Sequence, residues 1–290
     1  MASDQLFSKV YEACGNGNLQ EVEEGLPSLM LLSDNTEDDL KVLVHSASTE
    51  GHAELLSYLF AAGCPLDPDH AVYAAYCAES THYVQVLKVF IDREWNVNHD
   101  SRTFGTALYQ ALKNSNISLV RFLISNGADV NAECMVEVRI KTTVIGFPLG
   151  TTPLDSAARN GTPELLQLLI DHGARLENAN PLHAAVSSCA SSHSSFRISN
   201  LKFLLGKGMD INAIESFGEG SKFIVPHRPL GTPLHHAVRF GNVEICKFLL
   251  ENGADPNKKG THWGTPLEWA ERLAPHLLSP EVEGLLVMQP

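Results

Sequence analysis

The 290-residue sequence lacks the features that mark several large classes of protein. No apolar run approaches the roughly 18 residues that a membrane-spanning helix needs, and the start of the chain has no basic region followed by an apolar one. The six cysteines form no CxxC pair, which favours reduced thiols over disulfides or a zinc site. These absences predict a soluble, cytoplasmic protein without a membrane partner.

The motifs of common enzymes are also missing. The chain has no P-loop, no dinucleotide-binding glycine fingerprint, no G-x-S-x-G elbow and no HExxH. Its thirteen histidines lack the spacing of zinc ligands, since His235 and His236 are adjacent and therefore point to different faces of a helix. We expect neither a cofactor nor a bound metal.

Basic residues are scarce. The chain has 21 Lys and Arg against 34 Asp and Glu, a net charge of −13, and this disfavours nucleic acid, which requires a basic stripe. Residues 1–60 hold eleven acidic and two basic residues, a net charge of −9 that leaves −4 for the rest of the chain. The acidic region is either a surface for a basic partner or a solubilising cap, and we favour the cap.

A repeated unit is present, and it is clearest in residues 231–257, GTPLHHAVRFGNVEICKFLLENGADPN. Thr232 and Pro233 suit the N-cap and the first position of a helix. Gly241 separates this helix from a second, more apolar one, which ends at Gly253. Two helices of about ten residues cannot bury their apolar faces against each other alone, so similar units must stack.

Copies of the unit recur along the chain. Thr232 recurs as Thr265, a spacing of 33 residues, and further copies begin GTALYQAL, TTPLDSAA and NPLHAAV. The T-P-L-H start, the glycine between the helices and the G-A-D-x-N end resemble the ankyrin repeat. The resemblance implies an all-α solenoid of stacked helix-turn-helix units that recognises proteins without a cofactor. We expect one solenoid over residues 1–290, with a degenerate cap at 1–36, repeats at 37–264 and a cap repeat at 265–290.

Three insertions interrupt the repeats. Residues 133–150 and 214–231 lengthen two of the connections between successive units, and the connection between those two is short. The first insertion alternates apolar and charged residues, so we expect both to form β-hairpin fingers. The third, residues 187–198, is rich in serine and predicts a flexible loop between the two helices of one repeat.

The order of long, short and long connections predicts a notch between two fingers. A protein or peptide could bind in this notch and on the concave face of the inner helices. Alternatively, a small hydrophobic molecule could bind between the two fingers. The candidate binding residues are aromatic and arginine side chains in the fingers or before the inter-helix glycines: Phe104, Arg139, Phe147, Arg159, Phe217, Phe223, Arg239, Phe240 and Trp263. The alternatives are packing between fingers for Phe104 and Trp263, and simple solvation for the arginines.

The fourth residue of each T-P-L-H-like motif forms a ladder along the inner helices. Its members are Tyr109, Asp155, His183, His235 and Glu268. The resemblance implies that the two histidines tie their repeats to neighbouring backbone, and Asp155 is suited to capping backbone N–H groups. His236, one position further on, faces either the groove or solvent.

Two hypotheses follow. The first is a stand-alone binding module that recognises a protein or peptide through its fingers and inner helices. The second is a cofactor-free enzyme, such as a cyclase or isomerase, that acts on a small hydrophobic metabolite between the fingers. Its acid and base would come from Asp155 and His183, open to the notch, with Tyr109, His235 and His236 beside them. The sequence leaves the oligomeric state undetermined.

Overall fold

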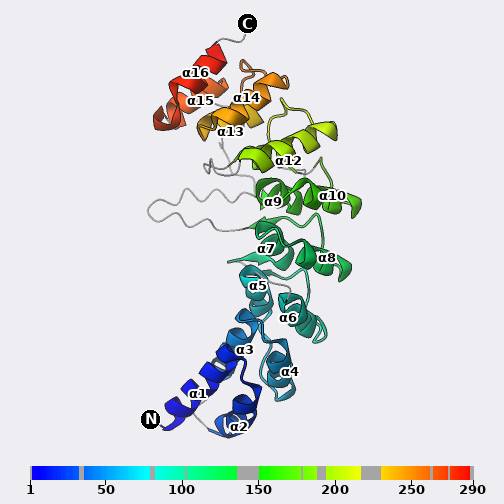
Figure 1. The fold of residues 1–290 in the computed structure, drawn as a ribbon, viewed down its shortest axis with the longest axis vertical. Coiled ribbons are helices and arrows are strands. Elements are labelled where there is room, and N and C mark those ends of the chain that lie inside the picture. Colours follow the sequence, from blue (N-terminus) through cyan, green and yellow to red (C-terminus); the bar gives the residue numbers. More distant parts are fainter. Residues whose placement is uncertain are drawn as a thin grey trace. The chain divides into compact units, whose positions relative to one another are not determined.

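A computed structural model describes residues 2–32, 36–78, 82–101, 103–135, 150–177, 179–187, 194–216, 230–261, 264–273 and 275–287. These residues form two compact units, residues 1–129 and residues 130–290. Each unit is built from pairs of short helices (Figure 1). This confirms the expected all-α class and the helix-turn-helix repeat.

The first unit contains four helix pairs among its described residues. In the first helices of successive pairs, α1 packs on α3, α3 on α5 and α5 on α7, while α4, α6 and α8 pack in the same order. A short antiparallel ladder pairs Asp100 with Thr106 and Ser101 with Gly105. The elements are α1 (Ala2–Asn16), α2 (Leu19–Met30), α3 (Glu37–Thr49), α4 (Ala53–Ala61), α5 (Pro68–Cys77), α6 (His82–Ile91), β1 (Asp100–Ser101), β2 (Gly105–Thr106), α7 (Ala107–Lys113) and α8 (Ile117–Ser125).

The second unit repeats the arrangement. Its first helices α9, α11, α13 and α15 pack in succession, as do the second helices α10, α12, α14 and α16. The elements are β3 (Cys134–Met135), β4 (Gly150–Thr151), α9 (Pro153–Asn160), α10 (Pro163–Asp171), α11 (Pro181–Val186), α12 (Ser194–Gly206), α13 (Pro233–Arg239), α14 (Val243–Glu251), α15 (Pro266–Leu273), a 3-10 turn (Pro275–Leu277) and α16 (Pro280–Val287).

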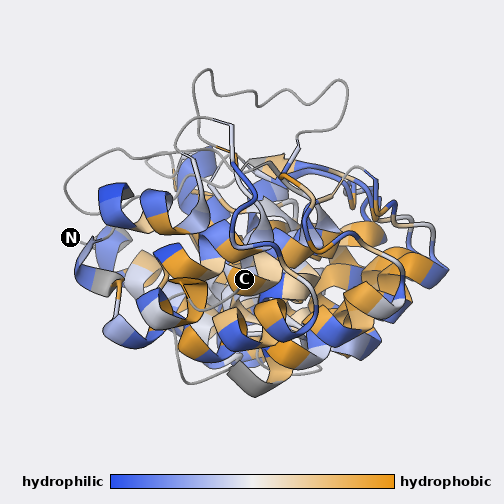
Figure 2. Ribbon diagram, turned by 90° about the horizontal axis from the view of Figure 1, so that it is seen from above, coloured by the Kyte–Doolittle hydropathy of each residue, from blue (hydrophilic) through white to orange (hydrophobic). Residues whose placement is uncertain are grey.

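Local sequence fixes where the helices begin and which faces they bury. Proline occupies the first turn of α9, α10, α11 and α13, where its missing N–H costs no intrahelical bond. The helices carry both hydrophobic and hydrophilic residues (Figure 2). In α13 and α14, for example, Leu234, Ala237 and Leu249 are completely buried. The small alanine lets neighbouring helices approach closely, and the leucines fill the space between them.

An asparagine clamp joins successive repeats. The side-chain Nδ2 of the asparagine donates to the carbonyl of the glycine that ends the next repeat's second helix. Its Oδ1 accepts from the backbone N–H two residues after that glycine. The clamps are Asn98 with Gly127 (2.9 Å) and Asp129 (2.8 Å), Asn131 with Gly173 (3.0 Å) and Arg175 (2.9 Å), and Asn212 with Gly253 (3.1 Å) and Asp255 (2.8 Å). The last residue of the G-A-D-x-N motif thus sets the register between repeats.

The structure describes the insertions only in part. Cys134 pairs with Thr151 and Met135 with Gly150, so the two ends of the insertion at 133–150 are adjacent and antiparallel. Residues 136–149 and 217–229 lie outside the described residues, and the two β-hairpin fingers and the notch between them therefore stay predictions.

The prediction of a flexible loop at residues 187–198 is wrong for the second half of that range, because α12 already begins at Ser194. Leu201 and Asn200 are fully buried, and Asn200 Nδ2 donates to the carbonyls of Ala158 (3.0 Å) and Gly161 (2.9 Å) at the end of α9. Within the described ranges, no helix is long and apolar enough to span a bilayer.

The end of α6 gives a test of backbone strain. The second helices α4, α8, α10, α12 and α14 are each followed by a glycine with positive φ, such as Gly127 (φ 89°), whereas α6 is followed by the exposed Glu94 with φ 62°. The backbone N–H bonds are equivalent, from Glu94 to Ile91 (2.9 Å) and from Gly127 to Ile124 (3.0 Å). Glu94→Gly should raise the free energy of unfolding by about 1 kcal/mol, because a side chain is disfavoured at positive φ.

Urea denaturation followed by circular dichroism measures this change. Glu94→Ala is the matched control, because it removes the carboxylate but keeps the Cβ atom that causes the strain. An equal gain in both variants would show that the charge, and not the backbone, limits stability at this position.

Candidate functional site

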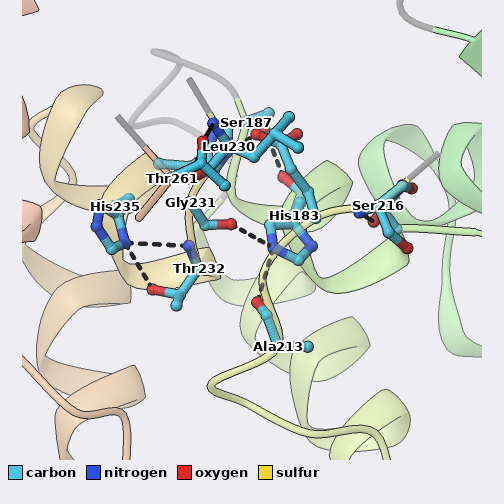
Figure 3. A network of polar contacts seen from close by, with 12 residues as sticks. His183, Ser187, Ala213, Ser216, Leu230, Gly231, Thr232, His235 and Thr261 are labelled. Atoms are coloured by element: carbon cyan, nitrogen blue, oxygen red, sulfur yellow. Dashed lines mark hydrogen bonds and ion pairs between the residues drawn. The ribbon is translucent and has the colours of Figure 1, made fainter. Parts of the chain in front are cut away.

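A polar network in the second unit holds both ends of the insertion at 214–231 (Figure 3). His183, in α11, lies between them: its Nε2 is 3.2 Å from the carbonyl oxygen of Ala213 and 3.0 Å from that of Gly231. Carbonyls only accept hydrogen bonds, so Nε2 carries the proton and is shared between the two. Burial, and then the nearby His236, lower the pKa of His183 to about 4, so the ring is neutral at pH 7.

Further hydrogen bonds also hold the two ends of the insertion at 214–231. Asn180 Nδ2 donates to Ser216 O (2.6 Å), and Ser216 N donates back to Asn180 Oδ1 (2.9 Å). Glu215 N donates to Gly231 O at 3.0 Å, which closes the base of the insertion. The start of α11 therefore acts as an anchor for the inserted segment.

His235 has the structural role that the resemblance implies for a ladder histidine. Its Nδ1 accepts a hydrogen bond from the backbone N–H of Thr232 (3.0 Å) and lies 2.9 Å from the hydroxyl of the same residue. Its Nε2 donates to the carbonyl oxygen of Gly264 (3.1 Å) at the start of the next repeat. The side chain is completely buried, and burial lowers its pKa. One neutral ring thus caps its own helix and links two repeats.

Neither expectation for His236 is correct, because it faces neither an open groove nor solvent. The side chain is 5% exposed, and its Nε2 lies 3.0 Å from Oε1 of Glu215, which is 6% exposed. The ring packs edge-on against His183 (5.6 Å between centroids) and Trp269 (5.7 Å). The insertion brings Glu215 over α13, which is why the repeat pattern alone could not predict this burial.

Asp155 is 4% exposed and caps backbone groups. Its Oδ2 accepts from Thr152 N (3.2 Å) and its Oδ1 from Asn180 N (2.7 Å). Burial raises the pKa of this carboxyl to about 6, against the lowering effect of these hydrogen bonds. Asp155 thus holds the start of α9 and the segment before α11, and it is not open to a notch as the enzyme hypothesis requires.

Three of the side chains named for acid–base chemistry, Asp155, His183 and His235, therefore bond backbone groups of the fold. Asp155 and His183 are bonded to different backbone groups, and Tyr109, in α7 of the first unit, is 8% exposed. Nothing in this arrangement leaves an accessible acid beside an accessible base. Among the described residues, no group of three or more His, Cys, Asp or Glu could hold a metal ion.

The candidate binding residues are scattered. Arg159, Arg239 and Phe240 are half-buried, and the Arg239 guanidinium lies 5.6 Å from the centre of the Phe240 ring. Five of the candidates lie outside the described residues: Arg139, Phe147, Phe217, Phe223 and Trp263. Phe104 is half-buried in the turn between β1 and β2, where it packs on aromatic rings of α5.

Phe104 belongs to an aromatic surface in the first unit, formed by His45, Tyr73, Tyr76 and Phe104. Tyr73 is central: its ring centroid is 4.8 Å from His45, 5.6 Å from Tyr76 and 4.9 Å from Phe104. Phe104 also contacts Tyr76, at 5.5 Å. Tyr76 is 40% exposed and the other three side chains are half-buried. Rings from α3, α5 and the β1–β2 turn therefore form one continuous, accessible surface.

Exposed apolar side chains are concentrated in this unit. The large hydrophobic residues that are exposed in the described part of the chain are Tyr11, Met30, Leu31, Leu32, Val42, Tyr76, Ile117 and Val287. All but Val287 belong to residues 1–129.

Sequence reasoning missed most of the aromatic surface. A ladder residue stands two positions before an alanine that recurs in the first helices of this chain, as Tyr109 stands before Ala111. The first two repeats after the N-terminal cap keep this alanine, and their ladder residues are His45 and Tyr73. The ladder could have been extended by this spacing, although the T-P-L motif is absent there.

Comparison with known families agrees with this architecture. The model for three consecutive ankyrin repeats matches residues 44–134 and 135–215, and the model for a single ankyrin repeat matches residues 231–261. The matches cover more than half of the chain, which therefore belongs to the ankyrin-repeat family.

Individual relatives are distant. The chain is 26% identical over 240 residues to the ankyrin repeat and KH domain-containing protein mask-1 of Caenorhabditis elegans, covering 73% of this chain and 8% of that protein. It is 26% identical over 184 residues to ankyrin repeat and SOCS box protein 6 of Homo sapiens, covering 62% of this chain and 39% of that protein. The chain thus spans less than two fifths of the length of these curated relatives.

A solved structure shows the same fold. The crystal structure of the human ASB11 ankyrin repeat domain matches with a TM-score of 0.57 and 20% sequence identity, covering 85% of this chain and 97% of that one. At this identity the likeness concerns the fold alone.

The anchor at His183 predicts a specific pH dependence. The unfolded chain binds a proton at this histidine near its ordinary pKa of 6.5, whereas the folded chain does so only near 4. Stability from the neutral ring is therefore present above pH 6.5 and is lost as the pH falls towards 4. Between pH 7 and pH 5 this loss should amount to about 2 kcal/mol.

His183→Gln removes the titration but keeps an amide donor near the position of Nε2. In urea denaturation at pH 7 and pH 5, the wild type should lose about 2 kcal/mol more stability than the variant. Asp155, whose raised pKa acts in the opposite direction between about pH 4 and 6, is present in both proteins and cancels. Equal losses in the two proteins would contradict a neutral buried His183.

Proposed function

We propose that the chain is a protein- or peptide-binding module and that its first unit binds through the aromatic surface of His45, Tyr73, Tyr76 and Phe104. The observation that carries the proposal is the accessible, preformed cluster of rings on the first helices α3 and α5 and the adjoining turn. Tyr76, at 40% exposed, leaves apolar area in water that a partner would cover.

The physical chemistry of the rings suits recognition of a macromolecule. Aromatic side chains bury large areas and lose little conformational entropy on binding, so they dominate the energetics of many interfaces. Tyr73, Tyr76 and Phe104 already restrict one another's positions, and a partner would not have to order them. The surface runs over two successive repeats and a turn, so a peptide or protein could touch several rings at once.

The contribution of the two insertions, at 133–150 and 214–231, stays a prediction. The hydrogen bonds of His183, Asn180 and Glu215 support it in one respect, since they fix both ends of the second insertion on the repeat. The enzyme alternative has no comparable support, because Asp155, His183 and His235 are buried and bonded to backbone groups. The small-molecule alternative depends on the two fingers and gains no support from the described residues.

Tyr76→Ala tests the proposal. Random twelve-residue peptides displayed on phage are selected on the immobilised full chain, and the enriched peptides are synthesised and titrated by calorimetry. Loss of the Tyr76 ring should weaken binding at least about tenfold, the effect of removing an interface anchor worth 1–2 kcal/mol.

Ile117→Ala is the matched control, because Ile117 is 38% exposed in the same unit but begins the second helix α8. It should change affinity less than about twofold, and urea denaturation should show that both variants remain folded. A selection that enriches the same peptides, or none, on wild type and on Tyr76→Ala would contradict the proposal.

A further inference from the structure

The first unit carries nearly all of the chain's net charge. Residues 1–129 contain eighteen acidic and seven basic residues, a net charge of −11, so residues 130–290 hold only −2 of the total of −13. The boundary between the two compact units thus separates a strongly acidic part from a nearly neutral one. A field of this size attracts cationic partners and repels anionic ones over about a Debye length, roughly 8–10 Å in physiological salt.

Acidic groups also lie beside the aromatic surface itself. The charge of Asp67, the N-cap of α5, acts to raise the pKa of both His45 and His70, against the larger effect of burial. The ring of His70 lies 4.9 Å from that of His45. The neighbouring Asp69 is exposed, and its Oδ1 is 2.7 Å from Nε2 of His99. Burial lowers the pKa of His45 and brings that of His70 to about 4, so these two rings add no positive charge at neutral pH.

A lysine side chain already lies over the ring of Tyr76, the most exposed member of the aromatic surface. Nζ of Lys113, the last residue of α7, lies 5.2 Å from the centroid of the Tyr76 ring. This distance is within the range of a cation–π interaction, in which the negative face of the ring attracts an ammonium or guanidinium group. Lys113 is exposed and its stem is flexible, so a partner's cation can take its place.

We propose that the partner of the aromatic surface is a cationic protein segment whose arginine or lysine side chains stack on Tyr76 and its neighbouring rings, displacing Lys113, while the acidic first unit attracts the segment. The inference rests on the proposed function and deepens it by naming the chemical class of the partner. An acidic segment would meet the repulsion of a net charge of −11. An apolar segment would gain from the rings but not from the field.

The composition of the selected peptides is the first test. Peptides enriched on the full chain and lost on Tyr76→Ala should contain an excess of Arg and Lys over Asp and Glu, relative to the unselected library. Their dissociation constants should rise by several fold between 50 and 300 mM NaCl, because screening weakens attraction between opposite charges.

Lys113→Met is the sharper test, because it removes the resident ammonium but keeps a flexible apolar stem of similar length. If the partner's cation replaces Lys113 over the Tyr76 ring, this variant should bind a selected cationic peptide about twofold to fivefold more tightly. Lys88→Met is the matched control: Lys88 is exposed on α6 of the same unit, so the change in net charge is identical but the Tyr76 ring is untouched. The gain should be clearly larger for Lys113→Met than for Lys88→Met.

The outcomes separate this inference from the proposed function. If Tyr76→Ala leaves peptide binding unchanged, the aromatic surface is not the binding site and both proposals fail. If Tyr76→Ala weakens binding but the selected peptides are neutral or acidic, or Lys113→Met weakens their binding, the surface binds a partner of another class. In that case only the cationic assignment is overturned.

Discussion

The structure depends on one constraint: a pair of helices of about ten residues cannot bury its own apolar face, so each pair must pack against the next. Completely buried leucines and alanines, such as Leu234, Ala237 and Leu249, form this contact from repeat to repeat. The asparagine clamps, for instance that of Asn212 on Gly253 and Asp255, then fix the register at the edge of each contact. Because these interactions all lie between neighbours, a segment inserted in one connection leaves the packing elsewhere intact.

The second insertion shows how such a segment is held. Its ends meet over α11 and α13, and a neutral buried histidine, His183, binds a carbonyl from each end. Burying an imidazole without charge is less costly than burying an ion, and its single proton is shared between the carbonyls of Ala213 and Gly231. His236 and Glu215 are buried next to it and bonded to each other. Two of the residues that suggested acid–base catalysis in the sequence, His183 and His236, thus hold an insertion on the repeat.

Sequence patterns predicted those features that are set locally. The threonine-proline helix starts, the glycine ends and the period of 33 residues each reflect the chemistry of one or two neighbouring residues, and together they define the repeat. The contacts of the candidate site were harder to predict from the sequence, because they join residues from different repeats. Glu215 reaches His236 from within an insertion, and Asn200 of α12 bonds the end of α9, so neither contact could be inferred from local pattern. His45 and Tyr73 were missed because their repeats had lost the T-P-L motif by which the ladder was traced.

Loss of that motif has a physical consequence for the first unit. Three ladder positions of the second unit hold Asp155, His183 and His235, and each of these side chains hydrogen-bonds backbone groups of its own or an adjacent repeat. In α5 the same position holds Tyr73, whose ring is half-buried and contacts other rings that are partly open to water. Tyr73 therefore joins neighbouring repeats through ring contacts and not through hydrogen bonds to backbone, and part of its ring stays open to water. The first unit also carries most of the acidic charge. An excess of like charge weakens a compact fold by self-repulsion, but it strengthens the attraction of a partner of opposite sign.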